Sequence, residues 1–241
     1  MKKLLLASTS TIYGSGYLAY LLDEVKQFFV GIDEVVFISY ARPSGISHDE
    51  YTAIAQKAFA SININIKGIH EFENPKEAIK NAKGIFTGGG NTFLLVKQLY
   101  EKGLMALLQE QINAGTPYMG TSAGSNIAGQ TVKTTNDMPI VYPPSFDALG
   151  LVDFNINPHY LDTDPDSTHK GETRETRILE YLTYNTIPVV GLREGSWLVV
   201  SGNKVILKGK LKARVFIDIN TIKEVKSGTE LMELFVKKTF H

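Results

Sequence analysis

The stretch TPYMGTSAGSNIAG, residues 116–129, joins a short apolar run to a cluster of small residues. Ser122 stands between Gly120 and Gly124, so the segment fits the pattern G-x-S-x-G. In that pattern a strand turns sharply into a helix and holds the serine hydroxyl above a sheet. The first N–H groups of the following helix lack partners and can stabilise an oxyanion. The alternative interpretation is a glycine-rich strand–helix turn with an incidental serine.

The segments before this turn repeat a strand–helix order. Apolar runs typical of strands alternate with helical patterns. Strands are expected at 2–8, 34–40, 62–69, 84–90 and 116–120, and helices at 16–29, 48–61 and 74–82, with one or two more helices at 92–115. This order favours an α/β fold with a mostly parallel sheet and helices on both faces. Ligands bind such sheets where the carboxyl ends of strands meet helix N-termini. We therefore expect four segments to meet at one edge, namely 8–16, 39–48, 87–91 and 120–124.

The pattern changes after residue 130. Residues 134–150 are rich in turn formers and are expected to be irregular. Further on, the sequence predicts a strand at 153–159, a helix at 170–184, strands at 186–192 and 213–219, a hairpin at 196–209 and a closing helix at 228–238. These strands could run antiparallel and extend the same sheet. No break in composition marks a second unit, so we expect one α/β domain over residues 1–241.

Composition excludes several classes of function. The chain has 241 residues, 25 Lys plus Arg, 25 Asp plus Glu, and no cysteine. A net charge of zero argues against a nucleic-acid partner or an anionic membrane surface. Without cysteine there is no disulfide, thiolate nucleophile or cysteine-bound metal. The apolar run at residues 4–7 is too short for a signal peptide and is expected to be a buried strand. No run approaches the ~20 residues of a membrane span, and a cytoplasmic location is expected.

A second glycine-rich loop follows a predicted strand at TGGGNT, residues 87–92. Three glycines allow the backbone to approach a ligand closely. A phosphate-binding P-loop is disfavoured because the Lys-Ser/Thr pair is missing. The loop could instead supply an N–H from Gly90 as partner to that of Ala123 in an oxyanion hole. A plain tight turn is the alternative.

A serine nucleophile needs a base, and His159 is the best placed of the five histidines. It ends an apolar strand in INPHYLD, after a proline that stiffens the approach. The acid that orients it could be Asp137, Asp162, Asp164 or Glu194. Glu194 follows the predicted strand at 186–192, which places it at the same sheet edge.

Two further motifs are rejected. GSGYLA, residues 14–19, fits G-x-G-x-x-A, but its first glycine does not adjoin the strand and no acid ends the second strand, so dinucleotide binding is not expected. DTDPDSTHKGET, residues 162–173, has three aspartates at calcium-loop spacing but lacks the glycine at loop position six and the glutamate at position twelve. We expect neither a metal nor an organic cofactor.

Taken together, several segments resemble the peptidase E family, serine peptidases related to the cyanophycinases. They are GGGNTF, GTSAGSN, TTNDMPIVYPPSFDALGL, INPHY, HKGETRETRI and GLREGSWLVV, and they span nearly the whole chain in order. The resemblance implies a fold like that of class I glutamine amidotransferases, which is flavodoxin-like, with serine in place of cysteine. It also implies hydrolysis of dipeptides that begin with aspartate. The tryptophan that often precedes the family's serine is Thr121 here, which alters the pocket wall.

The resemblance implies Ser122 as nucleophile and His159 as base. It leaves the third member open between Glu194, which geometry at a sheet edge favours, and Asp137, which would otherwise shape the pocket or accept the substrate's amino group. An aspartyl side chain also needs a cation. The segment at 170–177 offers Lys170, Arg174 and Arg177, of which Arg174 is preferred as a substrate-binding residue.

Asn91, next to the triple glycine, is expected to bind substrate as well. The expected partner is a small peptide with an N-terminal aspartate, and the chain could act as a monomer or a homodimer. Two alternative functions stay open. One is a cyanophycinase-like or isoaspartyl peptidase that uses the same triad, and the other is a non-catalytic binding protein with the same fold.

Overall fold

Short apolar strands and amphipathic helices alternate along the first half of the chain. The computed structural model describes residues 1–164, 166, 168 and 171–235. Its strands are β1 (Lys3–Ala7), β2 (Glu34–Ile38), β3 (Asn65–Gly68), β4 (Ile85–Thr87), β5 (Tyr118–Thr121), β6 (Asn155–Pro158), β7 (Val189–Leu192), β8 (Ser196–Ser201), β9 (Lys204–Gly209), β10 (Ala213–Asp218) and β11 (Thr221–Val225). Its α-helices are α1 (Leu22–Phe28), α2 (His48–Ala60), α3 (Pro75–Lys80), α4 (Thr92–Glu101), α5 (Met105–Ala114), α6 (Ala123–Asn126), α7 (Arg174–Tyr184) and α8 (Met232–Phe235).

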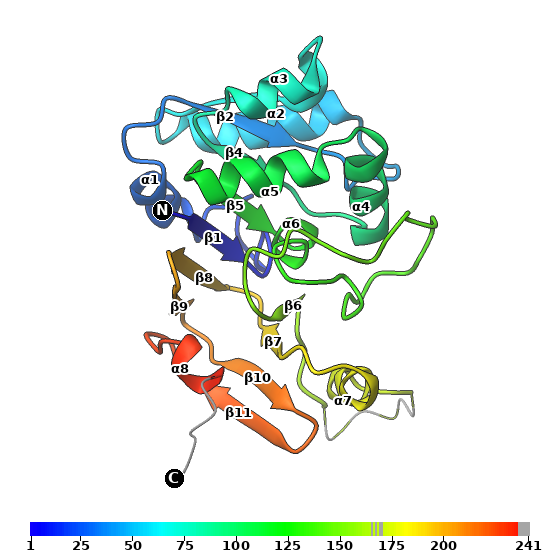
Figure 1. Ribbon diagram of the computed structural model, residues 1–241. Coiled ribbons are helices and arrows are strands. Elements are labelled where there is room, and N and C mark those ends of the chain that lie inside the picture. The colour runs from blue at the N-terminus through cyan, green and yellow to red at the C-terminus, as the bar shows by residue number, and fades with distance from the viewer. Residues whose placement is uncertain (165, 167, 169–170, 236–241) are drawn as a thin grey trace.

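The larger sheet has seven strands in the order β3-β2-β4-β5-β1-β8-β9 (Figure 1). The strands from β3 to β1 are parallel, whereas β8 and β9 run antiparallel and extend the sheet beyond β1. The prediction of a mostly parallel sheet with some antiparallel C-terminal strands is confirmed. Because β1 lies between β5 and β8, its carboxyl end adjoins both the Ser122 turn and the start of β8.

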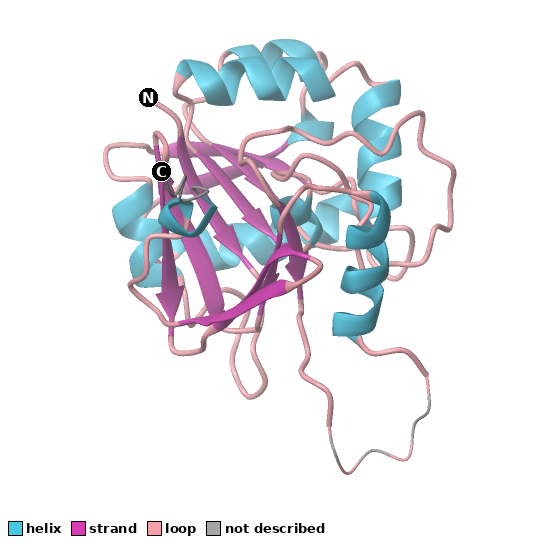
Figure 2. Ribbon diagram, turned by 60° about the horizontal axis from the view of Figure 1, so that its bottom comes forward, coloured by secondary structure: helices cyan, strands magenta, loops and turns pink. Residues whose placement is uncertain are grey.

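Alternate residues of the central strands enter two separate hydrophobic cores. In β1, Leu4 and Leu6 pack in one core with residues of α3, α4 and α5, while Leu5 and Ala7 pack in the other with residues of α1 and α2. Successive side chains of a strand point to opposite faces of its sheet. Helices therefore cover both faces, as predicted, and in Figure 2 they flank the strands on two sides.

A second sheet of four strands, in the order β11-β10-β7-β6, lies below β8 in Figure 1. The expectation that the whole tail extends the first sheet is therefore wrong for these strands, of which β6 and β7 are parallel to each other. The physical reason is that β8 occupies the free edge of β1 and β9 then occupies that of β8. The remaining apolar strands pair among themselves, and they pack Val190 and Val215 into the same core as Leu4 and Leu6.

Some predicted boundaries also need correction. The helix expected at 16–29 begins only at Leu22, because Leu18 has a φ of 58°, which a right-handed helix excludes. Strand β11 was not predicted, and the closing helix begins at Met232, while residues 236–238 of its predicted span lie outside the described residues. Within the described ranges no helix is long and apolar enough to cross a membrane.

Candidate active site

The turn between β5 and α6 holds Ser122 in a strained conformation. Its φ of 52° and ψ of −113° lie outside the regions that residues with a side chain ordinarily adopt. The flanking glycines are required by close packing, because a Cβ on Gly120 would overlap the Gly124 carbonyl and one on Gly124 would overlap the Thr87 carbonyl. The Ser122 N–H donates to the carbonyl of Ala7 at 3.1 Å. Strain of this kind persists only where the surrounding structure enforces it, and it clusters at functional sites.

A buried hydroxyl from the next turn of chain fixes this conformation. Ser125 Oγ lies 2.7 Å from the carbonyl oxygen of Ala7 and 2.8 Å from that of Gly120, and the residue is fully buried. Ser125 was not among the site residues predicted from the sequence. The signal that could have identified Ser125 is a serine three residues after Ser122 in a segment with no exposed face.

Three side chains from separate strand ends form a hydrogen-bonded chain. Ser122 Oγ lies 2.9 Å from His159 Nε2, and His159 Nδ1 lies 2.6 Å from Glu194 Oε1. Ser122 follows β5, His159 follows β6 and Glu194 lies two residues after β7. Both the imidazole and the carboxylate are partly open to solvent, with 36% and 48% of their side chains exposed. The geometry is that of a nucleophile, a base and an orienting acid.

Asp137, the other candidate for the acid, is occupied elsewhere. Its Oδ2 accepts the Thr92 N–H at 2.7 Å, at the start of α4, and lies 3.3 Å from Thr135 Oγ1. Within the described part of the chain it makes no hydrogen bond to His159. The carboxylate instead stabilises the positive end of α4, and its Oδ1 makes no hydrogen bond to any residue that the structure describes.

The two residues predicted to donate to an oxyanion are Gly90, in the triple-glycine loop, and Ala123, which directly follows Ser122. Within the described residues neither Gly90 nor Ala123 donates its N–H to a protein acceptor. The neighbouring Gly89 packs directly against Ser122, since a Cβ there would lie 2.9 Å from Ser122 Cβ. The Gly89 N–H, however, is already bound to Tyr51 Oη at 2.9 Å. The buried Tyr51, which was not among the site residues predicted from the sequence, thus holds the loop at Gly89, and the Gly90 N–H has no acceptor among the described residues.

Arg174, the predicted cation, begins α7 and is half-buried. It forms no ion pair with any residue that the structure describes, whereas the exposed Arg177 Nε lies 3.7 Å from Glu172 Oε2. Partial burial, followed by the positive charge of Arg177, lowers the pKa of Arg174, and the carboxylate of Asp137 opposes that shift. The third candidate, Lys170, lies outside the described residues.

The side-chain amide of Asn91 is hydrogen-bonded within the chain. Its Oδ1 accepts the Leu94 N–H at 3.0 Å as the N-cap of α4, and its Nδ2 donates to the Met138 carbonyl at 2.8 Å. These bonds join the triple-glycine loop to the segment that carries Asp137. Each polar end of Asn91 thus makes one hydrogen bond within the chain.

An apolar cavity of about 510 Å³ opens beside the triad carboxylate. Among its lining residues are Glu194, Ile12, Tyr20, Trp197 and Leu211. Tyr20 Oη donates to the Thr9 carbonyl at 2.6 Å, and burial, followed by the Glu194 charge, raises the pKa of Tyr20. The tyrosine therefore stays neutral next to the carboxylate.

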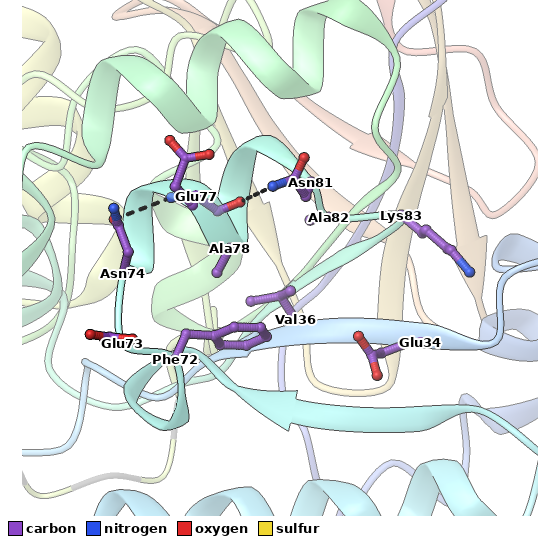
Figure 3. Close-up of a pocket in the computed structure, with 10 residues that line it drawn as sticks. All are labelled: Glu34, Val36, Phe72, Glu73, Asn74, Glu77, Ala78, Asn81, Ala82 and Lys83. Carbon is purple, nitrogen blue, oxygen red and sulfur yellow. Dashed lines mark hydrogen bonds between the residues drawn. The ribbon is translucent and has the colours of Figure 1, made fainter.

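A second hollow, of about 360 Å³, lies between β2 and α3 (Figure 3). Glu34 opens β2 and Lys83 precedes β4, so this hollow adjoins the amino ends of parallel strands. Its lining residues include no serine or histidine and no member of the Ser122 cluster. The candidate active site is the opposite edge of the sheet.

Comparison with known proteins gives a consistent result. The family described as "Peptidase family S51" matches residues 4–208. A peptidase E from Streptomyces coelicolor is 49% identical over 231 residues, covering 96% of this chain and 94% of the relative. A protein of Drosophila melanogaster named "Probable alpha-aspartyl dipeptidase" is 42% identical over 242 residues, covering 99% of this chain and 97% of the relative.

Solved structures resemble this one in fold. A crystal structure described as a candidate peptidase E protein from Listeria monocytogenes EGD-e superimposes with a TM-score of 0.66 at 25% identity, over 87% of this chain and 98% of that one. A peptidase from an acI-B1 actinobacterium gives a TM-score of 0.71 at 18% identity, over 95% and 96% of the two chains. The second likeness bears on the fold alone.

Proposed function

The chain belongs to peptidase family S51, and from that premise we propose that it hydrolyses the peptide bond after an N-terminal aspartate, with Ser122 as the nucleophile. It is a serine peptidase whose relatives include proteins named peptidase E and an alpha-aspartyl dipeptidase. The observation that carries the proposal is the hydrogen-bonded chain from Ser122 through His159 to Glu194, with a strained backbone at the serine.

The reaction proceeds by acyl transfer. Neutral His159 Nε2 takes the proton of Ser122 Oγ as the oxygen forms a bond to the aspartyl carbonyl carbon. When the tetrahedral intermediate collapses, the C–N bond breaks and His159 gives its proton to the leaving amine. His159 then takes a proton from water, which attacks the ester carbon. The C–Oγ bond breaks and the proton returns to Ser122.

Backbone N–H groups stabilise the negative charge on the oxygen of the tetrahedral intermediate by donating hydrogen bonds to it. Gly90 and Ala123 supply them from neighbouring loops, since neither N–H has another acceptor among the described residues. Donors fixed in place need no reorganisation as charge develops, and losing one typically costs ~2.7–4 kcal/mol. The bond from Gly89 to Tyr51 Oη keeps the loop in this orientation.

Recognition of an N-terminal aspartyl residue needs one cation and one anion. Arg174 binds the side-chain carboxylate, because a half-buried guanidinium without a described carboxylate partner gains from one. Asp137 accepts the α-ammonium group through Oδ1, while Oδ2 stays bound to the Thr92 N–H. The charge of Asp137 affects the pKa of Arg174, which supports the placement of these two opposite charges around the same substrate residue.

The test combines labelling with a substrate panel. A fluorophosphonate probe is expected to label the wild type and not Ser122→Ala, and the wild type is expected to hydrolyse Asp-Leu faster than β-Asp-Leu or Asp-Arg polymers. Faster turnover of the β-linked substrates would favour the isoaspartyl or cyanophycinase-like alternative. No labelling together with no hydrolysis would leave the non-catalytic binding protein.

A matched arginine pair tests the recognition step. Arg174→Ala is expected to raise KM for Asp-Leu strongly, while Arg177→Ala, an exposed position on the same helix face, leaves KM close to the wild-type value. Steady-state kinetics on Asp-Leu and Ala-Leu measure the change in preference. Equal effects of the two substitutions would contradict the assignment.

A further inference from the structure

Ser8 directly follows β1 and is fully buried. Its Oγ accepts the backbone N–H of His159 at 2.9 Å and donates to the carbonyl of Leu192 at 2.7 Å. The backbone N–H of Ser8 donates to Ser196 O at 3.0 Å. Because the single hydroxyl proton is committed to Leu192, the oxygen lone pairs face the His159 N–H. One side chain thus joins the ends of β1, β6 and β7.

The same strand end also holds the nucleophile. The carbonyl of Ala7 accepts the Ser122 N–H at 3.1 Å, one residue before Ser8 binds the N–H of His159. The backbones of Ser122 and His159 are therefore both hydrogen-bonded to consecutive residues at the end of β1, namely Ala7 and Ser8. These two backbone hydrogen bonds therefore help to set the distance of 2.9 Å between Ser122 Oγ and His159 Nε2.

His159 needs this support because its backbone is strained. It has a φ of 53°, a region that residues with a Cβ rarely adopt. The preceding peptide group is held at both ends: Asn136 Nδ2 donates to the Pro158 carbonyl at 2.8 Å, and the His159 N–H donates to Ser8. Fixing this peptide plane fixes the direction in which the imidazole leaves the backbone.

The second bond of the Ser8 hydroxyl reaches the segment that carries the acid. The Leu192 carbonyl accepts both Ser8 Oγ and the Tyr160 N–H, the latter at 3.2 Å. Leu192 ends β7, two residues before Glu194. The Ser8 hydroxyl therefore bonds to the backbone of both segments that the 2.6 Å bond connects, the one that carries His159 and the one that carries Glu194.

We propose that Ser8 is a positioning residue that aligns His159 between Ser122 and Glu194. This role rests on the proposed function of the triad. Removing the hydroxyl leaves the His159 N–H without its acceptor, so the peptide plane can rotate and the imidazole can move out of line with Ser122 and Glu194. Substrate contacts stay in place, so the effect falls on kcat rather than on KM.

The experiment compares two buried serines that each follow a strand. Ser8→Ala is the test and Ser39→Ala is its matched control. Ser39 comes directly after β2, is equally buried, and its hydroxyl lies 2.9 Å from His48 Nδ1, outside the triad. Ser8→Thr keeps the hydroxyl and serves as the rescue. Activity on Asp-Leu is measured well below the Tm of each variant, and folded protein is quantified by circular dichroism.

Ser8→Ala is expected to lower kcat on the order of 10²-fold, the scale of a misplaced catalytic group, with KM nearly unchanged. Ser39→Ala is expected to lower Tm but not kcat, and Ser8→Thr is expected to recover most of the rate. The rate of fluorophosphonate labelling at Ser122 should fall in parallel with kcat. If Ser8→Ala does not fold, Ser8→Cys carries the test, because a thiol is a weak acceptor and should give a kcat below that of Ser8→Thr.

An active wild type whose kcat survives in Ser8→Ala, or in Ser8→Cys where that variant carries the test, would overturn the role of Ser8 alone. So would equal losses of kcat in Ser8→Ala and Ser39→Ala, since these would show a general effect of removing buried hydroxyls. A wild type that neither hydrolyses aspartyl peptides nor reacts with the fluorophosphonate would overturn the proposed function, and the role of Ser8 with it.

Discussion

At the scale of single residues, Glu194 and Asp137 are two carboxylates with different surroundings. Glu194 Oε1 lies 2.6 Å from His159 Nδ1 and its side chain is about half exposed. Asp137 is bound to the Thr92 N–H at the start of α4. The structure thus places Glu194 at the histidine, the arrangement that the sheet-edge geometry favoured in the sequence, and we propose a substrate-binding role for Asp137.

The two carboxylates can be separated by their isosteric amides. Glu194→Gln is expected to lower kcat by about 10²–10⁴-fold, because an amide no longer fixes the histidine tautomer or stabilises the imidazolium. Asp137→Asn is expected to act mainly on KM, since it removes the charge that faces the substrate ammonium group. Steady-state kinetics on Asp-Leu measure both. A large fall in kcat for Asp137→Asn with little change for Glu194→Gln would reverse the assignment.

At the scale of elements, α2 connects a well-capped helix start to the oxyanion loop. Ser47 Oγ accepts the Glu50 N–H at 3.1 Å, and Glu50 Oε2 accepts the Ser47 N–H at 2.6 Å, which is a capping box. One turn further on, Tyr51 binds the Gly89 N–H. Tyr51 is itself held in the core by edge-to-face contact with Phe37, whose ring centroid lies 5.0 Å away.

Removal of the cap should therefore affect stability more than activity. Ser47→Ala is expected to cost about 1 kcal/mol of unfolding free energy, or roughly 2–4 °C in Tm for a chain of this size. The kcat should stay near the wild-type value because Tyr51 keeps its core contacts. Thermal and urea unfolding measure the loss. Ser47→Asp, which restores a capping oxygen, should recover it, and an equal loss in that variant would contradict the capping explanation.

At the scale of the whole molecule, an ion-pair cluster braces the second sheet next to the triad. Arg193, adjacent to Glu194, lies 2.6 Å from Asp162 and 2.8 Å from Glu224 of β11, and also donates to the Lys212 carbonyl at 2.7 Å. The cluster joins the segment after β6 to β10 and β11. Hydrogen bonding to Arg193 lowers the pKa of Asp162 below its ordinary value of 3.8.

This shift predicts a pH dependence with a definite sign. A carboxyl whose pKa is lower in the folded state stabilises the fold above its unfolded pKa, and the contribution is lost as pH falls through the folded value. Asp162→Asn should therefore lower Tm at pH 7. The Tm difference between variant and wild type should shrink as the pH is taken below 3.8. A difference that persists unchanged in acid would show that it does not come from the charge of Asp162.

The sequence pattern is sufficient to predict the parallel part of the first sheet and the turn at Ser122. Apolar runs of strand length separated by amphipathic helices leave few arrangements other than a parallel sheet covered on both faces. The turn is equally local, because Gly120 and Gly124 are where a Cβ would strike neighbouring backbone. These features depend on residues close in the chain, so the pattern of side chains is enough to predict them.

Which candidate residues contact one another at the site depends on the tertiary structure. Glu194 rather than Asp137 reaches His159 because β7 pairs beside β6 in a separate sheet, a pairing that the apolar pattern of the tail does not distinguish from extension of the first sheet. Ser8 and Tyr51 likewise acquire their partners from strands and loops distant in the chain. The physical reason is that the sequence does not show which of several carboxylates or hydroxyls will meet a given partner. Only the packing of the two sheets brings one of them within about 3 Å of that partner.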